Sequence, residues 1–172
     1  ISLGAGVGTS GASTSFGVAE NNFLGKGIKL NSNLMLSEEK IKGLFSYTKP
    51  NYKNSNKDLI LSMESTETDR MSDFGYKSNE TGFLIGTNFE YLEDLNFSPT
   101  LSVYFESIDT SSTASSLLKK QEGSYFDTEF SYGLVYDQRD QSYQATDGYI
   151  SSFYQSLPLN IDENQTLVNS YE

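Results

Sequence analysis

Apolar and polar residues alternate along most of this chain. The clearest run is 126–136, in which Phe, Tyr and Leu alternate with Asp127, Glu129, Ser131 and Gly133. A period of two is typical of a β-strand that has one apolar face. The period recurs about ten times, and no stretch has the pattern of a convincing amphipathic helix. The pattern therefore predicts an all-β, antiparallel fold.

Segments rich in glycine, asparagine or charge separate these runs. We expect strands at about 3–7, 12–20, 28–37, 41–47, 59–63, 83–91, 101–105 and 126–136, a ninth after Gly148 and a tenth from near Gln165. Longer polar loops are expected at 66–80 and 109–123, and short turns at 21–27 and 92–96. Many short strands at even spacing indicate a sandwich or a barrel.

The two phases of the alternation differ in charge. The apolar phase carries none in these runs, whereas the opposite phase carries Lys29, Lys42, Glu64, Glu90, Glu106, Asp127 and Glu129. A membrane barrel requires this bias, because a charge on its lipid face costs about 2–4 kcal/mol at mid-depth. A soluble sheet also avoids buried charge, so the bias favours a membrane barrel only mildly.

Two further features favour the membrane barrel. Aromatic residues stand near strand ends, where a bilayer interface favours them: Tyr47, Tyr91, Phe105, Phe126 and Tyr136. Ordinary β-propensity explains them about equally well. If the first strand starts at the periplasm, the long loops 66–80 and 109–123 both lie on the external side. The short turns then lie on the periplasmic side, as in outer-membrane barrels. The connections 50–58 and 137–147 are longer than this asymmetry predicts.

Composition narrows the function. Hydrophobic residues make up only 36% of the 172 residues, while 12 Tyr and 11 Phe raise aromatic content to 13%. The net charge of −11 argues against a nucleic-acid partner. With no cysteine and no histidine, the chain has no disulfide, no Cys/His metal site and no thiol nucleophile. We expect no catalytic residue, no metal and no cofactor.

One turn is distinctive. Glu20-Asn21-Asn22-Phe23-Leu24-Gly25-Lys26-Gly27 lies between two expected strands, and its glycines permit the positive φ of a tight turn. It resembles the turn after the second barrel strand of BamA-type outer-membrane assembly proteins, through Asn22, Phe23, Leu24, Gly25 and Gly27.

Other segments resemble the same family in the same order. Asp137, Arg139 and Asp140, followed by Thr146 and Gly148, are similar to its D-x-R-D…P-T-x-G stretch, with Ala145 in place of the proline. Lys49-Pro50-Asn51-Tyr52 is a partial match to a Pro-aromatic pair. The opening Gly4-Ala5-Gly6-Val7-Gly8-Thr9 resembles the first strand. TamA-type and two-partner-secretion relatives share this barrel, so the subfamily stays open.

The resemblance implies a fold, a location and a partner set. Residues 1–172 would be the N-terminal portion of a transmembrane β-barrel in the bacterial outer membrane, about ten strands of a larger barrel. The chain starts without Met and stops inside an expected strand, so we interpret it as a fragment of a mature protein. The resemblance implies about sixteen antiparallel strands preceded by periplasmic domains, and we therefore expect periplasmic domains and C-terminal strands outside these residues. The implied partners are outer-membrane lipids, unfolded outer-membrane protein clients and accessory lipoproteins.

The resemblance also implies insertion of client proteins without bond chemistry. An incoming strand would pair with the edge of the first strand, whose residues are Ile1, Ser2, Leu3, Gly4, Ala5, Gly6, Val7 and Gly8. Glycines here anchor the strand weakly and favour opening. Two alternatives remain at this stage: a passive outer-membrane channel or secretion pore, and a soluble β-barrel binding module.

Overall fold

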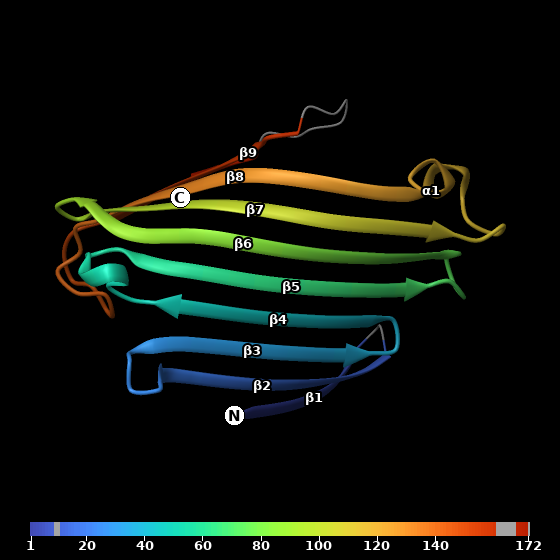
Figure 1. Ribbon diagram of the computed structural model, residues 1–172, viewed down its shortest axis with the longest axis horizontal. Helices are drawn as coiled ribbons and strands as arrows, with labels where there is room; N and C mark the ends of the chain where they lie inside the picture. The colour runs from blue at the N-terminus through green and yellow to red at the C-terminus, as the bar shows by residue number, and fades with distance from the viewer. Residues whose placement is uncertain (9–10, 161–167, 172) are drawn as a thin grey trace.

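The computed structural model describes residues 1–8, 11–160 and 168–171 as one antiparallel sheet of ten strands in sequence order (Figure 1). Thr9 and the predicted start of the tenth strand near Gln165 lie outside the described residues. The strands are β1 Ser2–Gly8, β2 Gly11–Phe23, β3 Ile28–Ser37, β4 Lys40–Lys49, β5 Asp58–Arg70, β6 Tyr76–Leu92, β7 Leu95–Thr110, β8 Gly123–Asp137, β9 Ile150–Pro158 and β10 Val168–Tyr171.

The sheet is open. Each strand pairs with its neighbours in sequence, and within the described part of the chain β1 pairs only with β2 and β10 only with β9. The prediction of an all-β antiparallel fold of about ten strands is therefore confirmed. The order is that of a meander, in which hairpin connections alternate between two ends of the sheet.

We call these ends proximal and distal. The connections 24–27, 50–57, 93–94 and 138–149 lie at the proximal end, on the left in Figure 1, and 38–39, 71–75 and 111–122 lie at the distal end. Among these connections, the proximal end has two short ones and the longer 50–57 and 138–149, and the distal end has two short ones and the longer 111–122. The predicted asymmetry of loop lengths is not present.

The predicted loop 66–80 is wrong. Strand β5 continues to Arg70 and β6 begins at Tyr76, with the ladder unbroken as far as the pair of Arg70 with Tyr76. Residues here are polar, but Thr and Ser fit a solvated ladder. Lys77 Nζ also lies 2.7 Å from Glu67 Oε1 on the neighbouring strand, in an exposed ion pair that contributes little to stability. Both strands are longer than predicted because backbone hydrogen bonds between strands form whether the side chains are polar or apolar.

The 111–122 connection contains a short helix that the strand pattern did not indicate. Helix α1 spans Ser116–Lys120, and the Ser115 hydroxyl caps it by accepting the N–H of Leu118 at 3.3 Å. A 3-10 turn, Tyr52–Asn54, occupies the connection between β4 and β5. No helix in the described ranges is long and apolar enough to cross a membrane.

The register separates the two phases of the alternation onto two faces. Tyr47, Leu61, Ile85 and Leu101 are direct cross-strand neighbours, and so are Phe45, Met63, Phe83 and Val103. We call the face that carries these side chains the apolar face. The opposite face, the polar face, carries every charged residue that the pattern assigned to the second phase, including Glu64, Glu106 and Asp127.

The sheet has almost no core. Among the described residues, Ile28 and Ala114 are the only buried hydrophobic side chains, whereas Phe83 is 45% and Ile85 51% exposed. Side chains of the apolar face are therefore open to the surroundings rather than covered by a second layer. A contiguous exposed apolar surface marks contact with a partner or a membrane.

The polar face packs aromatic rings against glycines. The Tyr104 ring lies over Gly82, where an added Cβ would stand 2.7 Å from two ring carbons, and Tyr154 covers Gly133 in the same way. Each tyrosine thus fills the space left by a missing side chain on the neighbouring strand, which fixes the register locally.

The two-faced sheet predicts an alternating labelling pattern. In the full-length protein in detergent, without other cysteines, Leu61→Cys and Met63→Cys should react slowly with a water-soluble maleimide because detergent covers the apolar face. Ser62→Cys and Glu64→Cys, on the polar face of the same strand, should react several-fold faster. Equal rates at all four positions would contradict the assignment of faces.

Candidate functional site

The free edge of β1 is the first candidate site. Seven residues of β1, from Ser2 to Gly8, pair with Gly17 to Gly11 of β2, while its other edge has no partner in the described structure. The predicted pairing segment Ile1–Gly8 thus coincides with this strand, apart from Ile1, which precedes it. A strand with one unpaired edge offers a row of backbone N–H and C=O groups to another strand.

The two faces of β1 carry different side chains, apolar residues on one face and serine or glycine on the other. Ile1, Leu3 and Val7 are 93%, 79% and 89% exposed. On the polar face Gly4 lies against Ser15, where an added Cβ would stand 2.6 Å from the Ser15 hydroxyl oxygen, and Ser2 lies in the same way against Gly17. Small residues on both strands leave β1 with few side-chain contacts to β2. Backbone hydrogen bonds hold it in place.

The distinctive segment 20–27 ends β2, which runs to Phe23, and leaves 24–27 as a tight turn whose glycines have the expected positive φ. Leu24, Gly25 and Gly27 have positive φ angles of 57°, 68° and 64°. The Asn22 carboxamide oxygen accepts the N–H of Gly27 at 2.7 Å, and the Asn22 carbonyl accepts the N–H of Gly25 at 2.9 Å. Asn22 thus closes the turn from both its side chain and its backbone. Leu24 is 72% exposed and Phe23 pairs with Ile28 at the end of the ladder.

The connection 138–149 is held by two carboxylates. Arg139 donates to Asp137 from Nε at 2.8 Å and from Nη2 at 2.7 Å, a bidentate pair. Asp140 accepts the Thr146 hydroxyl at 2.6 Å and the Thr146 N–H at 3.0 Å, and also the Asp147 N–H at 3.3 Å. The Thr146 hydroxyl bond chiefly lowers the pKa of Asp140. Ala145, where the family pattern has proline, leaves this network intact.

Gly148 has a separate role. Its φ is +89°, and a Cβ there would overlap the Gln138 carbonyl oxygen and lie 2.8 Å from Arg139 Cα. The two ends of the connection can approach this closely only with glycine at 148. The motif residues 137, 139, 140, 146 and 148 therefore form one compact unit.

This unit is anchored to the neighbouring turn, which the sequence did not indicate. The Asp94 carbonyl accepts the Asp137 N–H at 3.0 Å, and Asp94 itself has a positive φ of 62°. In the sequence, the feature that could have indicated this contact is the short turn 93–94 with its aspartate. Strands β4 to β7 lie in sheet order between the turn 20–27 and this unit, so the two motifs share the proximal end without forming one site.

The residues described here hold no cluster of three or more metal-ligating side chains. The arrangement supports strand pairing at β1 and contact of the apolar face with an apolar phase.

Comparison with known proteins agrees with this geometry. The Omp85 superfamily domain matches residues 22–168, from the Asn22 turn to the start of β10. The chain belongs to the Omp85 superfamily.

Among solved structures, this Omp85 sheet is similar to the crystal structure of BamA from Haemophilus ducreyi lacking POTRA domains 1–3. The TM-score is 0.65 at 21% sequence identity, and the match covers 91% of this chain and 33% of that one. This likeness concerns the fold, and the chain spans about a third of the length of that structure. A search of curated proteins found no match.

The close approach at Gly148 predicts a large effect of one methyl group. Gly148→Ala should destabilise the full-length protein by about 1–3 kcal/mol in urea unfolding, because alanine cannot adopt this φ without strain and its Cβ meets backbone atoms. Gly43→Ala is the matched control, since a Cβ at Gly43 meets nothing within 4 Å. Equal stability of the two variants would argue against the described packing.

The Asp140 network predicts a response to acid. Because its pKa is lowered in the folded state, the stability that Asp140 contributes is present above about pH 4, the usual pKa of Asp, and is lost as the pH falls through the depressed value. Asp140→Asn should remove this acid dependence from the connection 138–149. Nuclear magnetic resonance of the Thr146 and Asp147 amides against pH would report it, and unchanged titration in the variant would refute it.

Proposed function

We propose that this chain is part of the membrane-embedded barrel of an Omp85 protein that inserts β-barrel clients into the bacterial outer membrane. The observation that carries the proposal is the combination of an exposed apolar face with a glycine-rich first strand, in which small residues face small residues of β2. The first property suits lipid and the second suits strand pairing. The superfamily membership and the BamA-like fold support both parts.

The apolar face supports embedding in a bilayer. Along β6, this face carries only uncharged side chains from Asn79 to Phe89, and on β5 its first charge toward the distal end is Glu67, opposite Asn79. At about 3.3 Å per residue the β6 stretch spans roughly 33 Å, or roughly 25 Å across the membrane when a strand tilts by about 40°. That matches the roughly 25 Å apolar band of an outer-membrane barrel. Accordingly, the proposed location is the outer membrane, with its lipids as neighbours.

The same face argues against the soluble binding module. A soluble barrel or sandwich encloses its apolar side chains, whereas Leu61, Phe83 and Leu101 are between 39% and 45% exposed on one uncovered layer. Transfer of such a surface into water is unfavourable in proportion to its area. A passive channel shares the apolar face, and the feature that favours an insertase over a channel is the weak side-chain anchoring of the glycine-rich β1 to β2.

Pairing at β1 is the proposed mechanism. Client strands would bind through backbone N–H and C=O groups along Leu3–Val7, and no covalent chemistry is involved. Weak side-chain anchoring between β1 and β2 would lower the free energy needed to open the edge. Unfolded outer-membrane proteins are the proposed clients, and accessory lipoproteins are further proposed partners by analogy with the family.

Valine substitutions test this mechanism. Replacing Gly4, Gly6 and Gly8 together with Val in the full-length protein should slow client insertion several-fold, because β-branched residues stabilise the strand and fix it in place. Insertion of a radiolabelled client into proteoliposomes measures the effect. Gly43→Val is the control for a glycine with open space away from the edge. A triple variant that inserts clients at the normal rate would refute the role of β1.

A further inference from the structure

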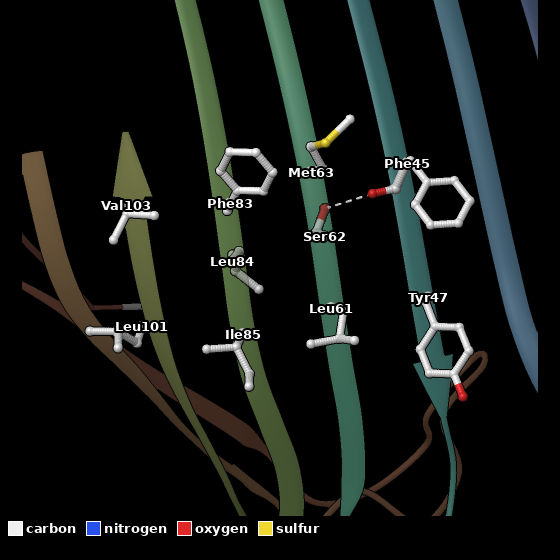
Figure 2. Close-up of a pocket in the computed structure, with 10 residues that line it drawn as sticks. All are labelled: Phe45, Tyr47, Leu61, Ser62, Met63, Phe83, Leu84, Ile85, Leu101 and Val103. Atoms are coloured by element: carbon white, nitrogen blue, oxygen red, sulfur yellow. Dashed lines mark hydrogen bonds between the residues drawn. The ribbon is translucent and has the colours of Figure 1, made fainter. Parts of the chain in front are cut away.

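A hollow on the apolar face lies between β4 and β7. It has a volume of about 500 Å³ and is lined by two rows of side chains. Figure 2 shows Phe45, Met63, Phe83 and Val103 in one row and Tyr47, Leu61, Ile85 and Leu101 in the next, all standing on four adjacent strands. The wall is almost entirely hydrocarbon. An aliphatic chain fits such a surface better than any polar ligand does.

Two lysines on the same face lie at the proximal end of the hollow. Lys49 is two residues beyond Tyr47 on β4 and pairs with Leu59, which is two residues before Leu61 on β5. Lys57 immediately precedes β5, and its Nζ lies 4.5 Å from the centre of the Phe89 ring. The hydroxyl of Tyr47 points away from Phe45, toward this end (Figure 2). The hollow thus continues from apolar rows into a cationic rim.

Aromatic rings hold these ammonium groups in position. Lys49 Nζ and Lys53 Nζ lie 5.8 Å and 5.5 Å from the centre of the Tyr52 ring, within the range of cation–π attraction. In the described residues, Lys49, Lys53 and Lys57 have no carboxylate within salt-bridge distance. The neighbouring Asp58 accepts the Asn51 N–H at 3.3 Å and belongs to the polar face. Positive charge at this rim is therefore not neutralised locally.

We propose that this surface binds one anionic glycerophospholipid. Its phosphate would lie between Lys49 and Lys57, and an acyl chain would run over the hollow toward Phe45 and Phe83. Charge complementarity selects the headgroup, because these lysines stand where the uncharged band ends and aromatic rings mark an interface. The proposal rests on the membrane-embedded state proposed above and assigns a specific lipid site within it.

Lipid retention by the full-length protein in detergent tests the site. Native mass spectrometry would compare dioleoyl phosphatidylglycerol with dioleoyl phosphatidylcholine, which share acyl chains but differ in net charge. A lysine near an anionic lipid contributes roughly five-fold in affinity, so we expect a preference for phosphatidylglycerol of about ten-fold or more. The preference should weaken as salt screens the charges.

Paired lysine variants distinguish binding at this site from non-specific attraction of anionic lipid to lysines elsewhere on the protein. Lys49→Gln with Lys57→Gln should reduce the preference to about one, while binding of phosphatidylcholine stays unchanged. Lys119→Gln with Lys120→Gln removes two lysines at the distal end, in α1, and should leave the preference intact. Loss of preference in the α1 variant as well, or in neither variant, would overturn the proposal. Displacement of the lipid by millimolar inorganic phosphate would also overturn it, by indicating a free-phosphate site.

A flotation assay distinguishes failure of the proposed lipid site from failure of the proposed membrane-embedded state. Wild type and the Lys49/Lys57 variant should both float with phosphatidylcholine vesicles after reconstitution, because the apolar face alone holds them in the bilayer. If wild type does not float, the membrane-embedded state itself is wrong. If both float and the headgroup preference is the same in both, the lipid site alone is refuted.

Discussion

The structure depends on one constraint: a single layer of strands must satisfy its backbone by edge-to-edge pairing, because within residues 1–8, 11–160 and 168–171 no second layer covers either face. Residues such as Phe83 and Ile85 contribute little to an internal core and remain about half exposed. The backbone ladder therefore unites the sheet, and an apolar surrounding phase supplies the environment in which its apolar face is stable. In lipid, an unpaired backbone group is costly, so the pairing along every strand contributes to stability.

The proximal end shows how local chemistry supports that ladder. Asn22 closes one turn, and Asp140 with Gly148 folds the 138–149 connection onto Asp94. These contacts stop the strands at defined residues and return the chain in register. By contrast, β1 has small side chains facing β2 and no partner on its other side in the described structure. The proposed pairing of client strands at β1 depends on this contrast between hydrogen-bonded connections and a first strand that small residues anchor weakly.

Alternation in the sequence was sufficient to predict the number of strands, their antiparallel order and the position of Glu64, Glu106 and Asp127 on the polar face, because side chains point to opposite faces at every step. It did not predict the charged residues that the register places near strand ends on the apolar face, such as Lys49, Glu67 and Lys77. The ends of β5 and β6 were not predictable in this way, since Glu67 and Thr68 join the ladder through their backbones. The glycines of the turn motifs were predicted by their φ requirement. The contact of Asp94 with Asp137 joins residues that are distant in sequence, and so does the placement of Lys57 beside Phe89. The alternating pattern does not specify such contacts.

Amide hydrogen exchange of β1 tests the central claim most directly. In the full-length protein in lipid nanodiscs, amides of Leu3–Val7 should exchange at least ten-fold faster than those of Leu59–Met63 in β5, which has partners on both sides. Addition of a client-derived β-strand peptide should slow exchange in β1 and leave β5 unchanged. Protection of β1 equal to that of β5 before the peptide is added, with no change afterwards, would contradict the account.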